Sequence, residues 1–166
     1  FKENCPDHRN SRVVDLVNQF KSFNCNVDVY DPWVSKNQAL KEYNIQPIDK
    51  PTKNKYDVII NFIGIGDPKK IIKDKNTFFE TSNFYDDLII SYLRNNKKCK
   101  FISISSGSVL SNFVDPVNNF SKTSLNLNDL YKGSNAYALT KIYLEIKHRL
   151  LKDLNIIDLR VFNYVS

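Results

Sequence analysis

Tyr137 and Lys141 form the pair of residues with the clearest potential for chemistry. They lie four positions apart in residues 135–141, so on a helix they share one face. A lysine ammonium beside a phenol stabilises the phenolate and lowers a tyrosine pKa from about 10. Such a phenol can take or give the proton of a carbinol. The alternative is an aromatic side chain packed on a helix beside a solvated lysine, and the spacing alone leaves both interpretations open.

Small and polar residues follow two predicted strands upstream of this pair. Ser106 and Ser108 come after the strand predicted at 101–105, and a serine hydroxyl there can orient a substrate oxygen while Tyr137 transfers a proton. Asn61 and Gly64 lie at the end of the segment 56–63, where small residues admit a close ligand. The structural alternative for the serines is a polar turn that closes a strand.

A parallel sheet would bring these residues to one edge. Strands are predicted at 27–30, 56–63, 101–105 and 156–162, with a weaker candidate at 45–48, and helices at 11–23, 35–43, 77–95 and 135–151. This alternation predicts the α/β class, with a doubly wound, mostly parallel, Rossmann-like sheet covered by helices on both faces. Ligands of such sheets bind at the carboxyl ends of the strands.

The beginning of this fold is incomplete. The four glycines form no G-x-G-x-x-G segment before the first helix, so the loop that normally holds a pyrophosphate is missing. Asp31 lies where a ribose-binding carboxylate is expected, although Asp31-Pro32 is equally consistent with a turn. We therefore expect this chain to bind NAD weakly or not at all.

Apolar periodicity predicts which helix faces point inward. The predicted inner residues of the helix at 77–95 are Tyr85, Leu88, Ile89, Tyr92 and Leu93. The predicted inner residues of the helix at 135–151 are Leu139, Ile142, Ile146 and Leu150.

The amino-acid composition of the chain limits the kinds of function that it could have. The chain has 166 residues, 42% hydrophobic and 25% charged, as expected for one globular domain with its own core. The net charge of +6 comes mostly from dispersed lysines, which favours solvated surface positions over nucleic-acid binding. Three cysteines without metal-type spacing indicate reduced thiols, a cytoplasmic location and no metal site. We expect no membrane segment, and the sequence leaves a homodimer open.

Residues 56–166 resemble the extended short-chain dehydrogenase/reductase family, the NAD-dependent epimerases and dehydratases of nucleotide sugars. The resemblance rests on residues 101–109, on Tyr137 and Lys141, and on the segment Leu159-Arg160-Val161-Phe162-Asn163. It implies that Ser106, Tyr137 and Lys141 are catalytic, that Lys141 also holds the NAD(H) ribose, and that Asn163 contacts the sugar nucleotide. Val109-Leu110-Ser111 departs from the Val-Tyr-Gly usual in that family, which affects local substrate contacts.

Residues 1–50 resemble a different family, the C-terminal domain of UDP-glucose/GDP-mannose dehydrogenases. The resemblance rests on residues 1–11 and on residues 27–34. It implies that Lys2 and Arg9 face the nucleotide sugar, and two cations before a helix N-terminus suit a phosphate. Cys5 does not match that family's nucleophile and is not assigned this role.

The chain is thus expected to be a fragment or a fusion, with the junction near residues 50–55. The leading hypothesis is an NAD(H)-using enzyme that modifies a nucleotide sugar, as in polysaccharide biosynthesis. The main alternative is a non-catalytic nucleotide-sugar-binding domain or an inactive fragment without its dinucleotide-binding loop. A polyanion-binding module is a weaker third hypothesis, which rests on net charge alone.

Overall fold

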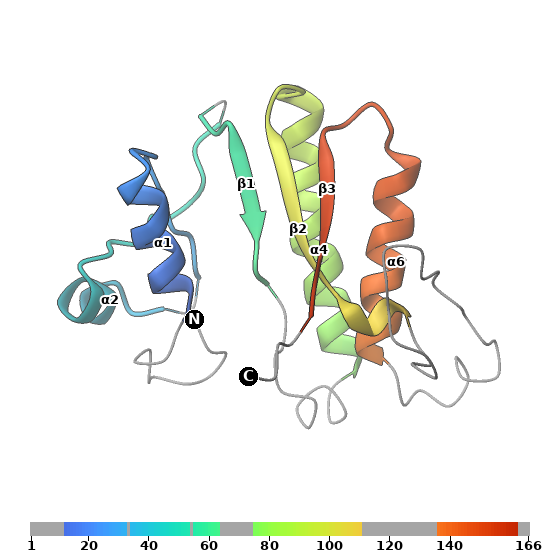
Figure 1. The fold of residues 1–166 in the computed structure, drawn as a ribbon, viewed down its shortest axis with the longest axis horizontal. Coiled ribbons are helices and arrows are strands. Elements are labelled where there is room, and N and C mark those ends of the chain that lie inside the picture. Colours follow the sequence, from blue (N-terminus) through green and yellow to red (C-terminus); the bar gives the residue numbers. More distant parts are fainter. Residues whose placement is uncertain (1–11, 33, 54, 64–74, 111–135, 163–166) are drawn as a thin grey trace. The chain divides into compact units, whose positions relative to one another are not determined.

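The computed structural model describes residues 12–32, 34–53, 55–63, 75–110 and 136–162 (Figure 1). The chain divides into two compact units, Phe1–Thr52 and Lys53–Ser166. Within the described parts, no helix is long and apolar enough to cross a membrane.

The first unit holds two helices, α1 (Arg12–Ser22) and α2 (Lys36–Tyr43). Its core is a small cluster in which Val14 and Val17 of α1 meet Ile45. Helix α2 begins after Ser35 and is capped at its C-terminus by Asn44, which has a left-handed φ of 53° and whose backbone N–H donates to the carbonyls of Ala39 and Leu40. Additional apolar contacts to this cluster come from Val13, Val27, Val29 and Tyr43.

The strand predicted at 27–30 is not present, nor is the weaker candidate at 45–48. The two segments do lie side by side, because the backbone N–H of Ile48 donates to the carbonyl of Val29 over 2.9 Å. One such bond falls short of a strand ladder. Pro32 and Pro47 lie at these segments and lack the N–H that a ladder requires.

The second unit contains a parallel three-stranded sheet. The elements follow in the order β1 (Val58–Asn61), α4 (Lys75–Asn95), β2 (Lys100–Ser106), the short 3-10 helix η1 (Gly107–Leu110), α6 (Ala136–Leu150) and β3 (Ile156–Val161). The spatial order is β1-β2-β3, and both pairings are parallel (Figure 1). The predicted α/β class with a parallel, Rossmann-like sheet is therefore confirmed.

Helices α4 and α6 lie on the same face of this sheet. Phe101 of β2 packs against Ile90 and Leu93 of α4, and its ring also lies 5.5 Å from that of His148 of α6. Right-handed crossovers explain the arrangement, because strands added in one direction place successive helices on one side. The expected cover on both faces is thus seen for one face in the described residues.

The two faces of β3 differ in an unexpected way. Asp158 and Arg160 point toward α6, to which both bond. Ile157, Leu159 and Val161 alternate with them and are 43%, 50% and 49% exposed. The polar side of this strand therefore faces the helices, and the apolar side faces away from them.

The predicted inner faces of both long helices need correction. Leu88 of α4 is 51% exposed, and Leu150 of α6 is 78% exposed, whereas Leu93 and Ile142 are buried as expected. Polar residues occupy much of the buried faces instead, so apolar periodicity does not mark them. The buried polar residues of α4 are Ser82 and Asp86, and those of α6 are Thr140, Lys141, Glu145 and His148.

Candidate functional site

Lys141 lies buried at the carboxyl end of the sheet. It is 8% exposed, and its Nζ donates a hydrogen bond to the carbonyl oxygen of Ile104 over 2.7 Å. Burial lowers the pKa of this amine, an effect that the more distant carboxylates of Asp86 and Asp158 partly oppose. The ammonium has three N–H donors, so the bond to Ile104 leaves two for another partner.

Tyr137 lies one turn before Lys141 at the beginning of α6. The Lys141 Nζ is 5.8 Å from the centroid of the Tyr137 ring, within the range of a cation–π contact. The same ring stacks on Phe78 of α4, with centroids 5.6 Å apart and an angle of 23° between the planes. Helix α6 therefore brings the two residues together, as their spacing predicted.

Ser106 ends β2, two residues after the carbonyl that Lys141 binds. Its Oγ accepts a hydrogen bond from the backbone N–H of Ser108 over 3.2 Å. In the described residues, no hydrogen bond joins Ser106 to the hydroxyl of Tyr137 or to Lys141. The convergence of the three groups in one catalytic set therefore stays a prediction.

Ser108 and Gly107 shape the turn beyond Ser106. The Oγ of Ser108 is buried without a hydrogen-bond partner among the described atoms. At Gly107, an added Cβ would lie 2.5 Å from the ring of Phe162, so a side chain there would have to displace that ring. The turn is therefore held close to the end of β3.

Asn61 ends β1 and makes a local contact. Its side-chain Oδ1 accepts a hydrogen bond from the backbone N–H of Ile63 over 2.9 Å. Asp31 is half-buried in the first unit. Their predicted cofactor-binding roles stay predictions, as does that of Gly64, which lies outside the described residues. Lys2, Arg9 and Asn163 also lie outside them, and their predicted substrate-binding roles stay predictions.

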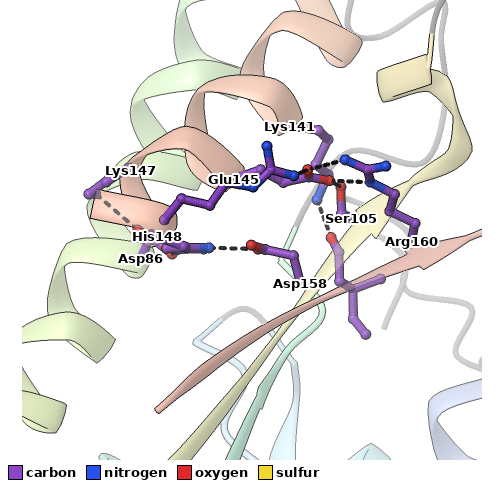
Figure 2. Close-up of polar contacts among 10 residues, drawn as sticks. Asp86, Ser105, Lys141, Glu145, Lys147, His148, Asp158 and Arg160 are labelled. Carbon is purple, nitrogen blue, oxygen red and sulfur yellow. Dashed lines mark hydrogen bonds and ion pairs between the residues drawn. The ribbon is translucent and has the colours of Figure 1, made fainter. Parts of the chain in front are cut away.

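A buried carboxylate that the sequence analysis missed lies one turn after Lys141. Glu145 accepts hydrogen bonds from the hydroxyl of Ser105 (2.7 Å) and from Arg160 Nε (3.0 Å) and Nη2 (2.6 Å), and Arg149 Nη2 adds a fourth at 3.0 Å (Figure 2). Burial would raise the pKa of this carboxyl, but the bonds from Arg160 and Ser105 outweigh it and lower the pKa.

His148, one turn further along α6, lies between two carboxylates. Its Nδ1 is 2.6 Å from Asp158 of β3, and its Nε2 is 2.8 Å from Asp86 of α4 (Figure 2). Burial opposes the charge of the ring, but the bonds to Asp158 and Asp86 outweigh it and raise the pKa to about 9. Both ring nitrogens therefore carry a proton at neutral pH.

Lys147 extends this cluster toward solvent. Its Nζ pairs with Asp86 over 2.9 Å and with Asp87 over 2.8 Å, and it donates to Asn83 over 2.9 Å. Burial lowers the pKa of Lys147, but these carboxylates outweigh it and raise the pKa. No group of three or more His, Cys, Asp or Glu in the described residues could hold a metal ion.

Some of these contacts could have been inferred from the spacing of residues in the sequence. Asp158 and Arg160 interrupt the otherwise apolar strand at 156–162 at alternate positions, so they share one side of it. Glu145 and His148 are three apart on α6 and share a face with Lys141. The partner Asp86, which is 62 positions from His148, has no such local signal.

Comparison with known proteins gives two separate likenesses. The model of the UDP-glucose/GDP-mannose dehydrogenase family, UDP binding domain, matches residues 1–87. The UDP-N-acetyl-D-glucosamine 6-dehydrogenase of Pseudomonas aeruginosa is 53% identical over 60 residues, which are 36% of this chain and 14% of the relative. The protein of the same name from Salmonella typhi is 44% identical over 64 residues, 39% of this chain and 15% of the relative.

The chain thus matches about one seventh of the length of these relatives. A third relative, Protein CapL of Staphylococcus aureus, is 38% identical over 60 residues, 36% of this chain and 14% of that protein. These matches confirm the resemblance noted for residues 1–50.

A solved structure shares the fold. It is described as the structure of the UDP-Glc/GlcNAc 4-epimerase from the human pathogen Campylobacter jejuni, and it aligns with a TM-score of 0.53 at 15% identity. The alignment covers 93% of this chain and 43% of the epimerase chain. The resemblance of residues 56–166 to epimerases is therefore confirmed at the level of the fold. By the family match over residues 1–87, this chain belongs to the UDP-glucose/GDP-mannose dehydrogenase family, through its UDP binding domain.

Proposed function

We propose that this chain binds a uridine-nucleotide sugar. The observation that carries the proposal is the match of residues 1–87 to a UDP binding domain. The names of two relatives add support, because both are dehydrogenases of UDP-N-acetyl-D-glucosamine. Lys2 and Arg9 precede α1 in the sequence, and cations before a helix N-terminus suit a diphosphate.

Calorimetric titration of the 166-residue chain with UDP and with UDP-N-acetylglucosamine tests this proposal. We expect saturable binding, weakened several-fold by Lys2→Ala and by Arg9→Ala because each removes a charge–phosphate contact. Lys97→Ala is the matched control, since Lys97 is exposed and pairs with exposed Asp153. Absence of saturable binding, or an equal loss with Lys97→Ala, would reject the proposal.

We propose as a second candidate that residues 53–166 carry a proton-transfer centre. It is favoured by the buried Lys141 amine beside the Tyr137 ring. Tyr137 would exchange a proton with a sugar hydroxyl, Lys141 would stabilise the phenolate and Ser106 would orient the sugar oxygen. NAD(H), when bound, supplies or accepts the hydride. Among the described residues Lys141 gives one N–H to Ile104, and its two other N–H donors suit ribose hydroxyls, which is the fit offered to this cofactor.

NADH formation from NAD and UDP-N-acetylglucosamine tests this second candidate. We expect slow turnover that Tyr137→Phe and Lys141→Met abolish and that Ser106→Ala reduces. Tyr143→Phe is the control, because Tyr143 is a half-exposed tyrosine on the same helix. No turnover by the unaltered chain, or full activity of Tyr137→Phe, would reject this candidate and leave the first untouched.

Affinity for NAD is expected to be low. Pro6 and Asp7 precede α1 where glycines would admit a pyrophosphate, and proline has no N–H to donate. Titration of the chain with NAD and NADH checks this, and micromolar affinity would contradict it.

We further propose that the chain joins two parental domains near residues 50–55. The boundary between its compact units, at Thr52 and Lys53, supports this junction. The family match continues to residue 87, through β1, which is consistent with a strand common to both parents. Expression of residues 53–166 alone tests the idea, because an independent unit should show a cooperative unfolding transition.

A further inference from the structure

Three polar contacts, each about one turn apart, attach one face of α6 to the sheet. Lys141 donates to the Ile104 carbonyl of β2, and Glu145 accepts from the Ser105 hydroxyl of the same strand. His148 bonds to Asp158 of β3 (Figure 2). Helix–sheet contacts are usually apolar, so this face of α6 is unusual because hydrogen bonds attach it to the sheet.

Glu145 is the member of this series with the most partners. Its side chain is 4% exposed, and it bonds to β2 through Ser105, to β3 through Arg160 and to its own helix through Arg149. A buried carboxylate would be costly without such partners. Here four N–H or O–H groups point at its two oxygens, so the charge is compensated.

Directional contacts restrain a helix differently from apolar ones. Apolar packing is non-directional, so a helix can slide along a sheet at modest cost. A hydrogen bond near 3 Å is largely lost after a displacement of about 1 Å. The bonds from Ser105 and Arg160 to Glu145 therefore fix the axial position of α6 against both β2 and β3.

We propose that Glu145 is a positioning residue for the Tyr137–Lys141 pair. By holding α6 to Ser105, it places Lys141 within reach of the Ile104 carbonyl, next to Ser106 at the end of β2. The inference rests on the proton-transfer role proposed above for Tyr137 and Lys141. Glu145 itself acts through the helix, because its bonds go to Ser105, Arg160 and Arg149.

The pH profile of Lys141 modification tests this proposal without any substrate. The chain is labelled with acetic anhydride over a range of pH, and the modified peptides are quantified by mass spectrometry. Lys97, which is exposed, serves as the reference within each molecule. In the unaltered chain the midpoint for Lys141 should lie below the ordinary lysine value of 10.5, because burial lowers the pKa of Lys141.

Three variants separate positioning from general stability. Ser105→Ala removes the bond between α6 and β2, and Glu145→Gln weakens it by replacing the charged acceptor with a neutral amide oxygen. In both variants the midpoint for Lys141 should move up toward the ordinary lysine value. Arg149→Gln removes a bond to the same carboxylate, but Arg149 belongs to α6 and cannot fix that helix against the sheet. We expect its Lys141 profile to match that of the unaltered chain.

Circular dichroism shows which variants are folded, and Ser105→Ala keeps the test valid if Glu145→Gln does not fold. An unchanged Lys141 midpoint in folded Ser105→Ala would overturn the proposal. An equal shift in Arg149→Gln would also overturn it, because the effect would then be one of general loosening. Loss of turnover in Tyr137→Phe is a separate result, so failure of the proposed function and failure of the positioning role are distinguishable.

Discussion

The two ends of the interface between the sheet and its helices are built from different kinds of contact. At the amino end of the strands, Phe101 is fully buried in an apolar cluster with Ile90 and Leu93 of α4. Toward the carboxyl end, the same side of β2 continues with Ser103 and Ser105, and hydrogen bonds replace apolar contacts. The same helices thus cover a sheet face that changes from apolar to polar along its length.

This difference separates two tasks of a protein core. Apolar burial contributes most of the free energy of folding but specifies position weakly. Buried hydrogen bonds and ion pairs contribute little net free energy when complete, and they are costly when one partner is lost. The contacts of Lys141 and Glu145 with β2 lie at the end where Tyr137 and Ser106 are found, so geometry is specified there at some expense of stability.

The largest effect is expected at the apolar end. Leu93→Ala should lower the free energy of unfolding by about 4 kcal/mol, because Leu93 is fully buried and its truncation leaves a cavity. Leu88→Ala on the same helix is the control and should cost less than about 1 kcal/mol, since Leu88 is 51% exposed. Urea denaturation measures both, and equal losses would contradict the apolar core described here.

The pH dependence of stability reports on the buried polar contacts of His148. The folded pKa of His148, about 9, lies above its ordinary value of 6.5. Its contribution, up to about 3 kcal/mol, is therefore complete below pH 6 and is lost as the pH rises through 9. The free energy of unfolding should fall between pH 7 and 10.

This fall should flatten in His148→Gln, and the variant should be the less stable protein at pH 7. Ser91→Ala, at an exposed position of α4, is the control and should keep the pH dependence of the unaltered chain. Parallel curves for the unaltered chain and His148→Gln would show that the two carboxylates do not hold the charged ring.

The smallest effect on stability is expected from the hydroxyl that bonds Glu145. Ser105→Ala should cost about 2 kcal/mol, the typical contribution of one hydrogen bond to a charged partner. Ser91→Ala, at an exposed position of α4, should remain within about 0.5 kcal/mol of the unaltered chain. A loss of several kcal/mol for Ser105→Ala would mean that the polar end contributes stability as well as position.

The regular elements of the second unit were accessible from the sequence. Runs of apolar, β-branched residues marked the strands at 56–63, 101–105 and 156–162, which the structure assigns to 58–61, 100–106 and 156–161. Apolar and β-branched residues marked these strands even though one side of β3 is half-exposed. The segment 27–30 has a similar pattern but pairs in no ladder with the described residues, and pairing is a property of the whole fold.

The inner faces of α4 and α6 show where sequence patterns stop being informative. Periodicity assigned Leu88 and Leu150 to the core because it counts apolar residues, whereas Asp86 and Glu145 are the residues actually buried. Those carboxylates are tolerated inside because His148 and Arg160 compensate them. These pairs join residues distant in sequence, and one sequence gives no means of pairing them.

The candidate site, like the helices, could be predicted only in part from the sequence. The spacing of Tyr137 and Lys141 predicted their proximity, and the structure places the amine 5.8 Å from the ring centroid. The bond from Lys141 to Ile104 depends on how α6 lies on β2, which the spacing does not contain. The catalytic roles themselves stay predictions.

The exposed apolar side chains of β3 affect how strongly copies of the chain associate in solution. Ile157, Leu159 and Val161 form a half-exposed row on the last strand of the described sheet. The net charge of +6 keeps copies apart in dilute buffer, but the Debye length shrinks from about 30 Å at 0.01 M salt to about 3 Å at 1 M. Aggregation of this chain should therefore depend on ionic strength, with clear solutions at low salt and turbidity as salt is added.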